Sequence, residues 1–379
     1  LEPLIAKIIY IDERSEGRDK VYSTIRMKLI KNIQIYAPEN LGVKDVLISD
    51  SKIEKIDEHI EFTYPIETID GTGCVLTPGL IDRHVHITGG GGEAGFISRA
   101  RPIDVKEILD AGITTVIGLL GTDGFTRSTK ELFAKAKELT QKGVHTYILT
   151  GSYAYPSNTL TNSMEDDIVF IDSILGVKLA LSDHRSSHVT EEELTRLASR
   201  IRTASLIAGK QANLTIHMGD EKQALDLVFN VLEKADIPVS LFQPTHCSRN
   251  PHLFKQAVQF TEMGGTFDIT CDGNGKTLNY IRQIKNTEKV TISSDAQGSW
   301  STYNEDGSVK KIGITPISNL KNEFIYLKNE LGYEKALPFF TKNVANVLGF
   351  KSIGQIKEGF DCDLVIWKED EIQKVITKK

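Results

Sequence analysis

The chain lacks the features that would place it in a membrane, on a nucleic acid or outside the cell. Its 379 residues contain no run of about 18 apolar residues, so no transmembrane helix is expected. The formal net charge of −6 provides no basic face for a nucleic acid. The apolar stretch at residues 4–10 is too short for a signal peptide and is followed at once by charged residues. The few cysteines form no Cys-x-x-Cys pair and are typical of reduced thiols in a cytoplasmic protein; they are Cys74, Cys247, Cys271 and Cys362.

What the chain does contain is ordinary for a large globular enzyme. It is 40% hydrophobic and 25% charged, and its length suits a barrel with an accessory domain. Residues 1–26 are charged and irregular, and a strand-like pattern opens at Met27. Two interpretations of residues 1–26 remain open. They are an N-terminal extension, non-native in origin, or they form an additional N-terminal strand.

From Leu76 onward, apolar strands alternate with amphipathic helices. The predicted strands are Gly79–His84, Ile113–Leu119, His145–Thr150, Ile174–Leu181, Asn213–His217, Pro238–His246, Thr266–Thr270 and Val290–Ser294. The clearest predicted helices are Thr129–Lys142, Glu191–Ala208 and Glu221–Ala235. Eight such repeats favour an α/β fold, a (β/α)8 TIM barrel. An open doubly wound sheet is the alternative, but no Gly-x-Gly-x-x-Gly follows the first strand.

Short strand-like segments also flank the barrel region. Residues 28–36, 43–50 and 51–56 show a strand period, and so does the C-terminal segment Ile356–Val375. We expect these segments to combine in a small β-sandwich domain of residues 27–75 and 355–379, beside a hydrolase barrel of residues 76–354.

The most informative stretch is His84-Val-His86, which closes an apolar strand and precedes four glycines and Glu93. Alternate residues of a strand face the same side, so the two imidazoles point to one place, as a metal site requires. The glycines let the backbone approach a ligand closely, and Glu93 then brings a carboxylate to the metal site. A chance His-x-His followed by a loose loop is the alternative, and the combination with the later residues argues against it.

Four more polar residues lie in or at the ends of later apolar strands. They are Lys178, His217, His246 and Asp295. In a barrel, functional residues gather at the C-terminal ends of the strands, so these side chains converge if the barrel closes. Each one alone has an ordinary explanation, because a histidine at a strand end is often a hydrogen-bonded core residue and Ser-Asp often begins a helix.

Lys178 is the hardest of these to explain as a structural residue. A lysine inside an apolar strand should lose its charge or extend to water. Carbamylation by CO2 would turn it into an anion able to bridge two metal ions. With two Zn²⁺ in the site, the carbamate, Asp295 and a bridging hydroxide offset three of the four positive charges.

Taken together, these six positions resemble the binuclear amidohydrolase superfamily. Within it, four segments resemble the isoaspartyl (β-aspartyl) dipeptidases: HVHITGGGGEAG at 84–95, GLLGTDG at 118–124, GVKLALSDHRS at 176–186 and PTHCSRN at 244–250. The resemblance spans roughly residues 27–375. It implies a β/α barrel with a small β-sandwich domain and two zinc ions held by six ligands. These ligands are His84, His86, carbamylated Lys178, His217, His246 and Asp295.

The resemblance also implies roles for the residues around the substrate. Glu93 matches the acid that holds the free α-amino group, and Thr122 matches a threonine at the aspartyl end. Tyr153 matches a tyrosine that polarises the scissile carbonyl. Arg185 and Arg249 match arginines that bind substrate carboxylate, and Ser299 matches a serine beside the catalytic Asp295. The catalytic residues implied are Asp295, Tyr153 and Glu93.

The charges of such a substrate agree with these residues. A β-aspartyl dipeptide carries two carboxylates and one ammonium, which two guanidinium groups and one carboxylate complement. Surface salt bridges are the alternative role for Arg185 and Arg249, but each lies one short loop beyond a predicted ligand. Two departures from the family are visible. The glycine-rich stretch between Thr270 and Val290 is short, which leaves room for a shifted substrate preference, and Cys247 is interpreted as a buried bystander.

The sequence therefore predicts a zinc metallopeptidase that uses a metal-bridging hydroxide to hydrolyse the isopeptide bond of β-aspartyl dipeptides. Alternatives within the superfamily are a dihydroorotase-like or hydantoinase-like cyclic amidase and an N-acyl amino-acid deacylase. An inactive scaffold homologue is the non-enzymatic alternative, and the complete ligand set argues against it. The predicted partner is a small-molecule dipeptide, with no nucleic acid and no membrane, and a homo-oligomer is expected.

Overall fold

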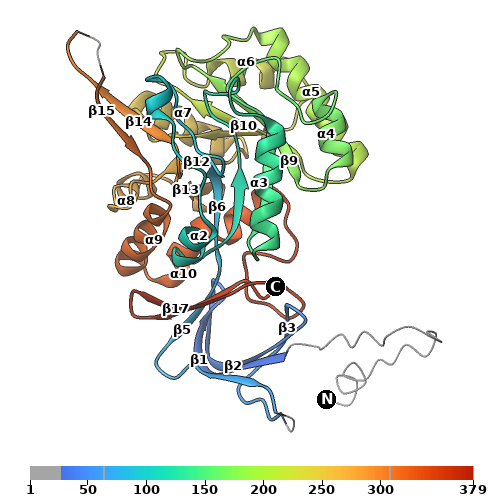
Figure 1. Cartoon of the computed structure of the whole chain (residues 1–379), viewed down its shortest axis with the longest axis vertical. Coiled ribbons are helices and arrows are strands. Elements are labelled where there is room, and N and C mark those ends of the chain that lie inside the picture. The colour runs from blue at the N-terminus through green and yellow to red at the C-terminus, as the bar shows by residue number, and fades with distance from the viewer. Residues whose placement is uncertain (1–26, 63–64, 307–308, 379) are drawn as a thin grey trace, which may run out of the picture.

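The computed structural model describes residues 27–62, 65–306 and 309–378. Within these residues a β/α barrel stands on a smaller sheet, and a long hairpin projects from the barrel at the upper left of Figure 1. No helix in the described ranges has both the length and the apolar character needed to cross a bilayer. The predicted extension at residues 1–26 lies outside the described residues.

The barrel is built from eight parallel strands that follow one another along the chain. They are β6 (Leu80–Val85), β7 (Ile113–Gly118), β8 (His145–Gly151), β9 (Ile174–Leu181), β10 (Asn213–Met218), β11 (Phe242–Thr245), β12 (Phe267–Thr270) and β13 (Val290–Ser293). Strands β6 to β11 form one sheet in sequence order, and β12 pairs with β13. Because β11 packs beside β12 and β13 beside β6, the strands curl into one ring. The predicted α/β barrel is therefore confirmed.

Helices cover the barrel between successive strands (Figure 1). They are α2 (Val105–Asp110), α3 (Thr129–Gln141), α4 (Met164–Phe170), α5 (Glu191–Ala208), α6 (Asp226–Lys234), α7 (Pro251–Glu262), α8 (Thr277–Ile281), α9 (Ser318–Leu331), α10 (Tyr333–Ala336) and α11 (Lys342–Leu348). Short 3₁₀ turns are η1 (Phe96–Ser98), η2 (Val239–Leu241), η3 (Thr287–Lys289) and η4 (Leu337–Phe340). In helix α5 the local sequence sets both ends of the helix. Thr190 and Glu193 form a capping box at its start, and Gly209, in the left-handed conformation, ends it.

The smaller sheet combines strands from both ends of the described chain. Its strands are β1 (Met27–Tyr36), β2 (Asn40–Ser49), β3 (Lys52–Asp57), β4 (Glu67–Asp70), β5 (Val75–Pro78), β16 (Leu364–Lys368) and β17 (Glu371–Ile376). Strand β16 pairs antiparallel with β5, which joins the C-terminal strands to the N-terminal ones. Its core is a separate apolar cluster that includes Ile30, Ile33 and Leu364. The division into domains at residues 75/76 and 354/355 stays a prediction.

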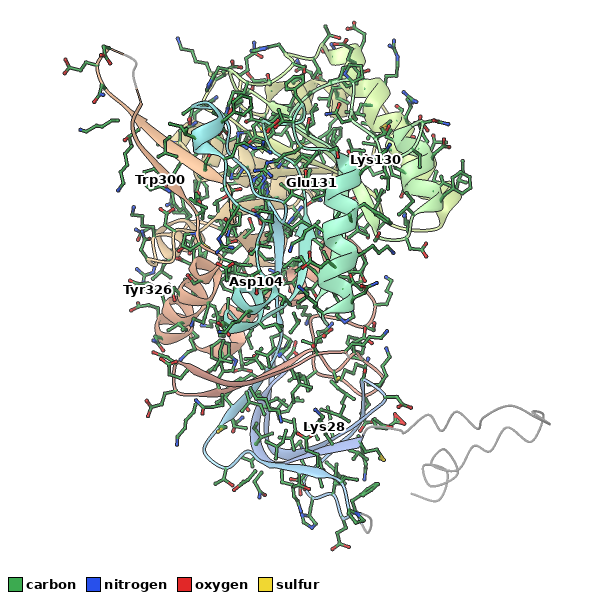
Figure 2. The ribbon with its side chains drawn as sticks, in the orientation of Figure 1. Lys28, Asp104, Lys130, Glu131, Trp300 and Tyr326 are labelled. Carbon is green, nitrogen blue, oxygen red and sulfur yellow. The ribbon has the colours of Figure 1, made fainter. Side chains whose placement is uncertain are left out.

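Aromatic packing and hydrogen bonds link the smaller sheet to the barrel. Trp367 of β16 is fully buried, and its indole N–H donates to Thr77 Oγ1 over 2.9 Å. Its ring lies 5.4 Å from that of Phe324 on α9. On the same side of the barrel, His145 at the start of β8 pairs with Asp363 at 3.0 Å. In Figure 2, Lys28 marks the smaller sheet and Asp104 the barrel above it.

Three segments differ from the sequence prediction. The helix predicted from Glu221 to Ala235 begins only at Asp226, because residues 222–225 form turns. Residues 239–241, predicted as the beginning of a strand, form the 3₁₀ turn η2 after Pro238, and β11 covers only Phe242–Thr245. The sequence analysis also missed an antiparallel hairpin after the eighth barrel strand, formed by β14 (Ser299–Tyr303) and β15 (Val309–Ile314). This hairpin carries Trp300, labelled in Figure 2, beside the open end of the barrel.

Candidate active site

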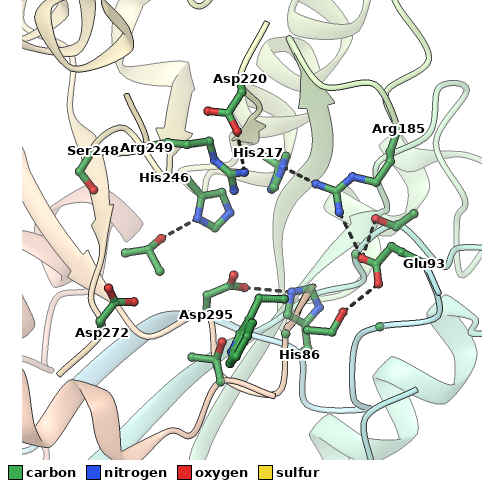
Figure 3. A pocket seen from close by; sticks show the side chains of 18 of the residues that line it. His86, Glu93, Arg185, His217, Asp220, His246, Ser248, Arg249, Asp272 and Asp295 are labelled. Carbon is green, nitrogen blue, oxygen red and sulfur yellow. Dashed lines mark hydrogen bonds and ion pairs between the residues drawn. The ribbon is translucent and has the colours of Figure 1, made fainter. Parts of the chain in front are cut away.

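A cavity of about 950 Å³ lies over the C-terminal ends of the barrel strands. Its floor carries imidazoles and a carboxylate, and its walls come from the segments that follow each of the barrel strands β6 to β13. This volume is at the upper end for small-molecule sites, and polar groups converge in it, as expected of an enzyme pocket. Figure 3 shows these side chains directed into one space.

His84 near the end of the first barrel strand and His86 just after it meet Asp295, which follows the last strand. His86 Nε2 lies 3.1 Å from Asp295 Oδ1, and His84 Nε2 lies 3.4 Å from the same oxygen. One ligand atom from each of His84, His246 and Asp295 falls within a 4.8 Å group, which could hold a metal ion. The closing of the barrel thus brings together residues more than 200 positions apart in the sequence.

Lys178 lies at the bottom of this cluster and is fully buried within β9. Its Nζ is 3.2 Å from His84 Nε2. Burial lowers the pKa of Lys178 to about 7, so much of the amine is neutral near neutral pH. A buried amine of this kind is both a possible ligand and a nucleophile.

The remaining histidines complete a group of neutral imidazoles. The rings of His217 and His246 lie 4.6 Å apart, and those of His84 and His246 lie 5.0 Å apart. Burial lowers the pKa of His217 to about 3 and holds the pKa values of His84 and His246 well below the ordinary value. Uncharged imidazoles keep the lone pairs that metal ions bind, so this donor set fits a metal centre.

Asp295 remains ionised among these rings. Burial raises its pKa, but the hydrogen bond from His86 and the charges of neighbouring groups outweigh that effect and lower it to about 2. The backbone at the site is unusual as well, because His246 and Asp295 have positive φ angles of 62° and 55°. Such strain in non-glycine residues is found chiefly at functional sites, where surrounding structure supports it.

The glycine run after His86 holds the loop close to its neighbours. Gly89 has φ of 84°, and a Cβ there would lie 2.2 Å from the carbonyl oxygen of Ala100. The buried guanidinium of Arg127 donates to that same oxygen over 2.8 Å and fixes the fold of the loop. The loop therefore requires glycine for close backbone approach, and it presents Glu93 to the cavity.

Glu93 is held by three donors from three different segments. Thr122 Oγ1 and Arg185 NH1 each donate to its Oε1 over 3.2 Å, and Ser299 Oγ donates to its Oε2 over 2.8 Å. Its side chain is 18% exposed and faces the cavity. In Figure 3, Glu93 and Arg185 lie on one side of the pocket, and Arg249, Ser248 and Asp272 lie on the other.

The last two predicted residues, Tyr153 and Arg249, also line the cavity. The hydroxyl of buried Tyr153 lies 2.6 Å from His217 Nδ1. Arg249 NH1 lies 3.4 Å from Asp220 at the cavity rim. All the predicted site residues are thus brought to one place, although their individual roles stay predictions.

Sequence reasoning missed several residues at this site. Asp183 follows β9 and contacts both Arg185 and His217. Lys276 and Tyr280 line the cavity from the short stretch between β12 and β13, and Trp300 lines it from the hairpin. The segment Ser182-Asp-His-Arg185 after β9 is a turn in the structure, so no strand alternation in the sequence pointed to Asp183.

The comparison that decides the family is with a solved structure. The β-aspartyl dipeptidase of Fervidobacterium islandicum AW-1, in complex with a β-Asp-Leu dipeptide, is 38% identical, with a TM-score of 0.89. The match covers 93% of this chain and 95% of that one.

The chain belongs to the β-aspartyl dipeptidase family of amidohydrolases. The general amidohydrolase family model matches residues 75–235, from β5 to just beyond α6. Curated relatives match over shorter regions. A dihydroorotase of Listeria monocytogenes is 29% identical over 220 residues, covering 56% of this chain and 50% of that enzyme. An imidazolonepropionase of Staphylococcus aureus is 39% identical over 95 residues, covering 24% of this chain and 22% of its own. The matches thus span half or less of these curated relatives.

Proposed function

We propose that this chain is a metal-dependent isoaspartyl dipeptidase that hydrolyses the isopeptide bond of β-aspartyl dipeptides. The observation that carries this proposal is the position of Glu93, whose carboxylate faces the cavity and accepts hydrogen bonds from Thr122, Ser299 and Arg185. Arg249 lies on the other side of the same cavity. A free α-ammonium fits the carboxylate, and a substrate carboxylate fits the guanidinium. The relative of known structure was solved with such a dipeptide, which supports the proposal.

The metal ligands proposed are His84, His86, Lys178, His217, His246 and Asp295, and two zinc ions are the proposed occupants. When bound, two metal ions lower the pKa of water and stabilise negative charge on oxygen. Lys178, with its pKa near 7, has the neutral amine that adds to the carbon of CO2 and releases a proton to form a carbamate. A ¹³C NMR carbamate signal after incubation with ¹³CO2, absent in Lys178→Ala, would test this modification.

The protein's own groups have separate tasks in the proposed reaction. Both histidine contacts of Asp295 fall on Oδ1, which leaves Oδ2 to take a proton from the attacking water. Asp295 then gives this proton to the leaving amine. The hydroxyl of Tyr153 turns from His217 to the substrate carbonyl and stabilises the oxygen as it becomes negative. The products are aspartate and a free amino acid.

The deciding experiment is hydrolysis of β-Asp-Leu beside α-Asp-Leu by zinc-reconstituted protein, with amino-acid release as the readout. Cleavage of the β-linked form alone is the expected result. A cyclic amidase is the second candidate, because a dihydroorotase matches 56% of the chain. Turnover of dihydroorotate or a hydantoin, with no cleavage of β-Asp-Leu, would replace the dipeptidase proposal with this one. A cytoplasmic location and a homo-oligomer stay predictions.

A further inference from the structure

Asp183 is a buried carboxylate that none of the proposed chemical steps uses. It lies just beyond β9, on the short segment between Lys178 and Arg185, and is 3% exposed. An ionised carboxylate in such a place costs free energy unless donors satisfy it. The donors that surround Asp183 connect two parts of the active site.

The first connection runs to Arg185. Asp183 Oδ1 accepts from Arg185 Nε over 2.8 Å, and Oδ2 accepts from NH2 over 2.8 Å, which makes a two-pronged pair. The backbone N–H of Arg185 also donates to Oδ1 over 2.9 Å. All three guanidinium nitrogens therefore have protein partners: Nε and NH2 donate to Asp183, and NH1 donates to Glu93.

The second connection runs to His217. Its Nε2 lies 2.9 Å from Asp183 Oδ2. A carboxylate only accepts hydrogen bonds, so Nε2 carries the proton and Nδ1 keeps its lone pair. The Tyr153 hydroxyl donates to that lone pair over 2.6 Å. Arg185 NH2 lies 3.4 Å from His217 Nε2 because both donors share one oxygen.

These contacts form a continuous series of hydrogen bonds from the histidine cluster to Glu93, the proposed partner of the substrate's α-ammonium. It runs from His217 through Asp183 and Arg185 to Glu93. Arg249, by contrast, has a long 3.4 Å ion pair with Asp220, a side chain that is 64% exposed. Of the two arginines, Arg249 has the guanidinium less committed to protein partners within the described part of the chain.

We propose that Asp183 is a positioning residue that fixes the tautomer of His217, with the proton on Nε2, and, through Arg185, the place of Glu93. In this assignment Arg249, rather than Arg185, supplies the two-pronged contact to a substrate carboxylate. The assignment of Glu93 and Arg249 to substrate rests on the proposed function. The assignment of the His217 proton does not, because it concerns the protein alone.

The main test is Asp183→Asn, which keeps the shape but presents an amide N–H to donor groups. Apo protein would be titrated with Zn²⁺ against a chromophoric chelator, and we expect zinc affinity to fall about 10- to 100-fold. KM for β-Asp-Leu should rise as Glu93 loses its support. Asp110→Asn is the matched control, because Asp110 forms an exposed pair with Lys106 on α2, away from the cavity. Wild-type zinc affinity and KM in Asp183→Asn would overturn the proposal.

A measurement on the unaltered protein guards against a variant that fails to fold. In apo protein labelled with ¹⁵N-histidine, long-range ¹H–¹⁵N spectra report which nitrogen of each ring is protonated. We expect His217 to be protonated on Nε2. Protonation on Nδ1 would overturn the proposal whatever the substrate of the enzyme proves to be.

The two arginines supply a further contrast. Arg185→Gln should weaken zinc binding and raise KM, because Arg185 is part of the series of hydrogen bonds that joins His217 to Glu93. Arg249→Gln should raise KM for β-Asp-Leu and leave zinc affinity unchanged. The reverse pattern, with Arg185→Gln affecting KM alone and Arg249→Gln without effect, would contradict the assignment. If the wild-type protein cleaves no β-aspartyl dipeptide, the proposed function fails, and the zinc and NMR results still decide the role of Asp183.

Discussion

Two groups of histidine and aspartate in this protein look alike by composition and differ in chemistry. His84, His246 and Asp295 gather at the C-terminal ends of the strands, and His145, Asp361 and Asp363 gather at the junction with the smaller sheet. In each group, one ligand atom per residue falls within 4.8 Å of the others. From spacing and residue type alone, both groups would be predicted to bind a metal ion.

The two groups differ in the direction in which their surroundings shift the pKa values of the histidines. At the cavity, burial lowers the pKa values of His84 and His246, so their rings are neutral and can bind a metal. At the junction, burial lowers the pKa of His145, but the hydrogen bond and charge of Asp363 outweigh it, and the net shift is upward. His145 therefore holds a proton more strongly than the cavity histidines do, and a proton on the ring competes with a metal ion for its lone pair.

One of the junction carboxylates, that of Asp361, has further partners of its own. Asp361 pairs with Lys52 at 2.5 Å and accepts from Ser352 over 2.9 Å. The cavity group instead opens onto about 950 Å³ of space and has strained backbone at His246 and Asp295. A metal centre is thus recognised by neutral donors with an open approach, and a structural cluster by charges that already neutralise one another.

The largest expected effect comes from Asp295→Asn. This change should keep much of the metal but lower kcat by about 10²- to 10⁴-fold, because the proton acceptor is lost. Steady-state kinetics with metal analysis would measure both. Asp363→Asn is the counterpart at the junction and should leave kcat nearly unchanged. Near-normal turnover in Asp295→Asn would remove the proton-transfer role from this residue.

Replacing one histidine in each group tests the comparison directly. His246→Asn should lower zinc affinity at least about tenfold, as expected for loss of a ligand where even supporting residues cost this much. His145→Asn should retain the wild-type metal content. Elemental analysis after dialysis against a defined zinc buffer distinguishes the two. Equal metal loss in both variants would contradict the division of the groups by protonation.

The substrate side of the cavity gives the next effect. Arg249→Met should raise KM for β-Asp-Leu about tenfold or more, since the proposed charge partner of a substrate carboxylate is removed. Metal content should not change. A dipeptide panel with one carboxylate amidated would show which substrate group Arg249 contacts. An unchanged KM would exclude Arg249 from the substrate pocket.

At the junction, stability should depend on pH. The pKa of His145 is raised above its ordinary 6.5, so the stabilisation it gives is complete below pH 6.5 and is lost as the pH rises through the raised value. Burial also raises the pKa of Asp363 from 3.8, and this contribution is likewise lost as the pH rises, but in a window that begins at pH 3.8. We expect the Tm advantage of wild type over His145→Gln to be about 2–4 °C at pH 5.5 and to shrink above neutral pH. An advantage that grows with pH would show the sign to be wrong.

The smallest expected effect concerns Lys276 at the cavity mouth. It is 72% exposed and lies 3.8 Å from Asp272, so its contact with a substrate is solvent-screened. Lys276→Met should leave kcat/KM for β-Asp-Leu unchanged and lower that for β-Asp-Glu by up to about fivefold. If Lys276→Met leaves kcat/KM for β-Asp-Glu at the wild-type value, the residue C-terminal to the β-aspartyl bond does not contact this side chain.

Much of the fold was predictable because it follows from local pattern. Strand β9 and helix α5 have the predicted bounds, since one is a continuous apolar run and the other has strong capping residues. The hairpin β14–β15 was missed, although Asp306-Gly307 between alternating residues is a turn signal. Residues 239–241 were misassigned because Val239 and Leu241 of this 3₁₀ turn lead directly into the apolar run of strand β11.

Local pattern was enough to predict the alternation of strands and helices, the polar residues at strand ends and the family that these motifs resemble. Contacts between distant segments set which histidine pKa values are lowered, which arginine pairs with Asp183 and which His–Asp group opens onto the cavity. The physical reason is that hydrophobic periodicity is local, whereas protonation depends on burial and on charges from distant parts of the chain. His145 and His246 cannot be told apart until the barrel has placed Asp363 beside one and other neutral rings beside the other.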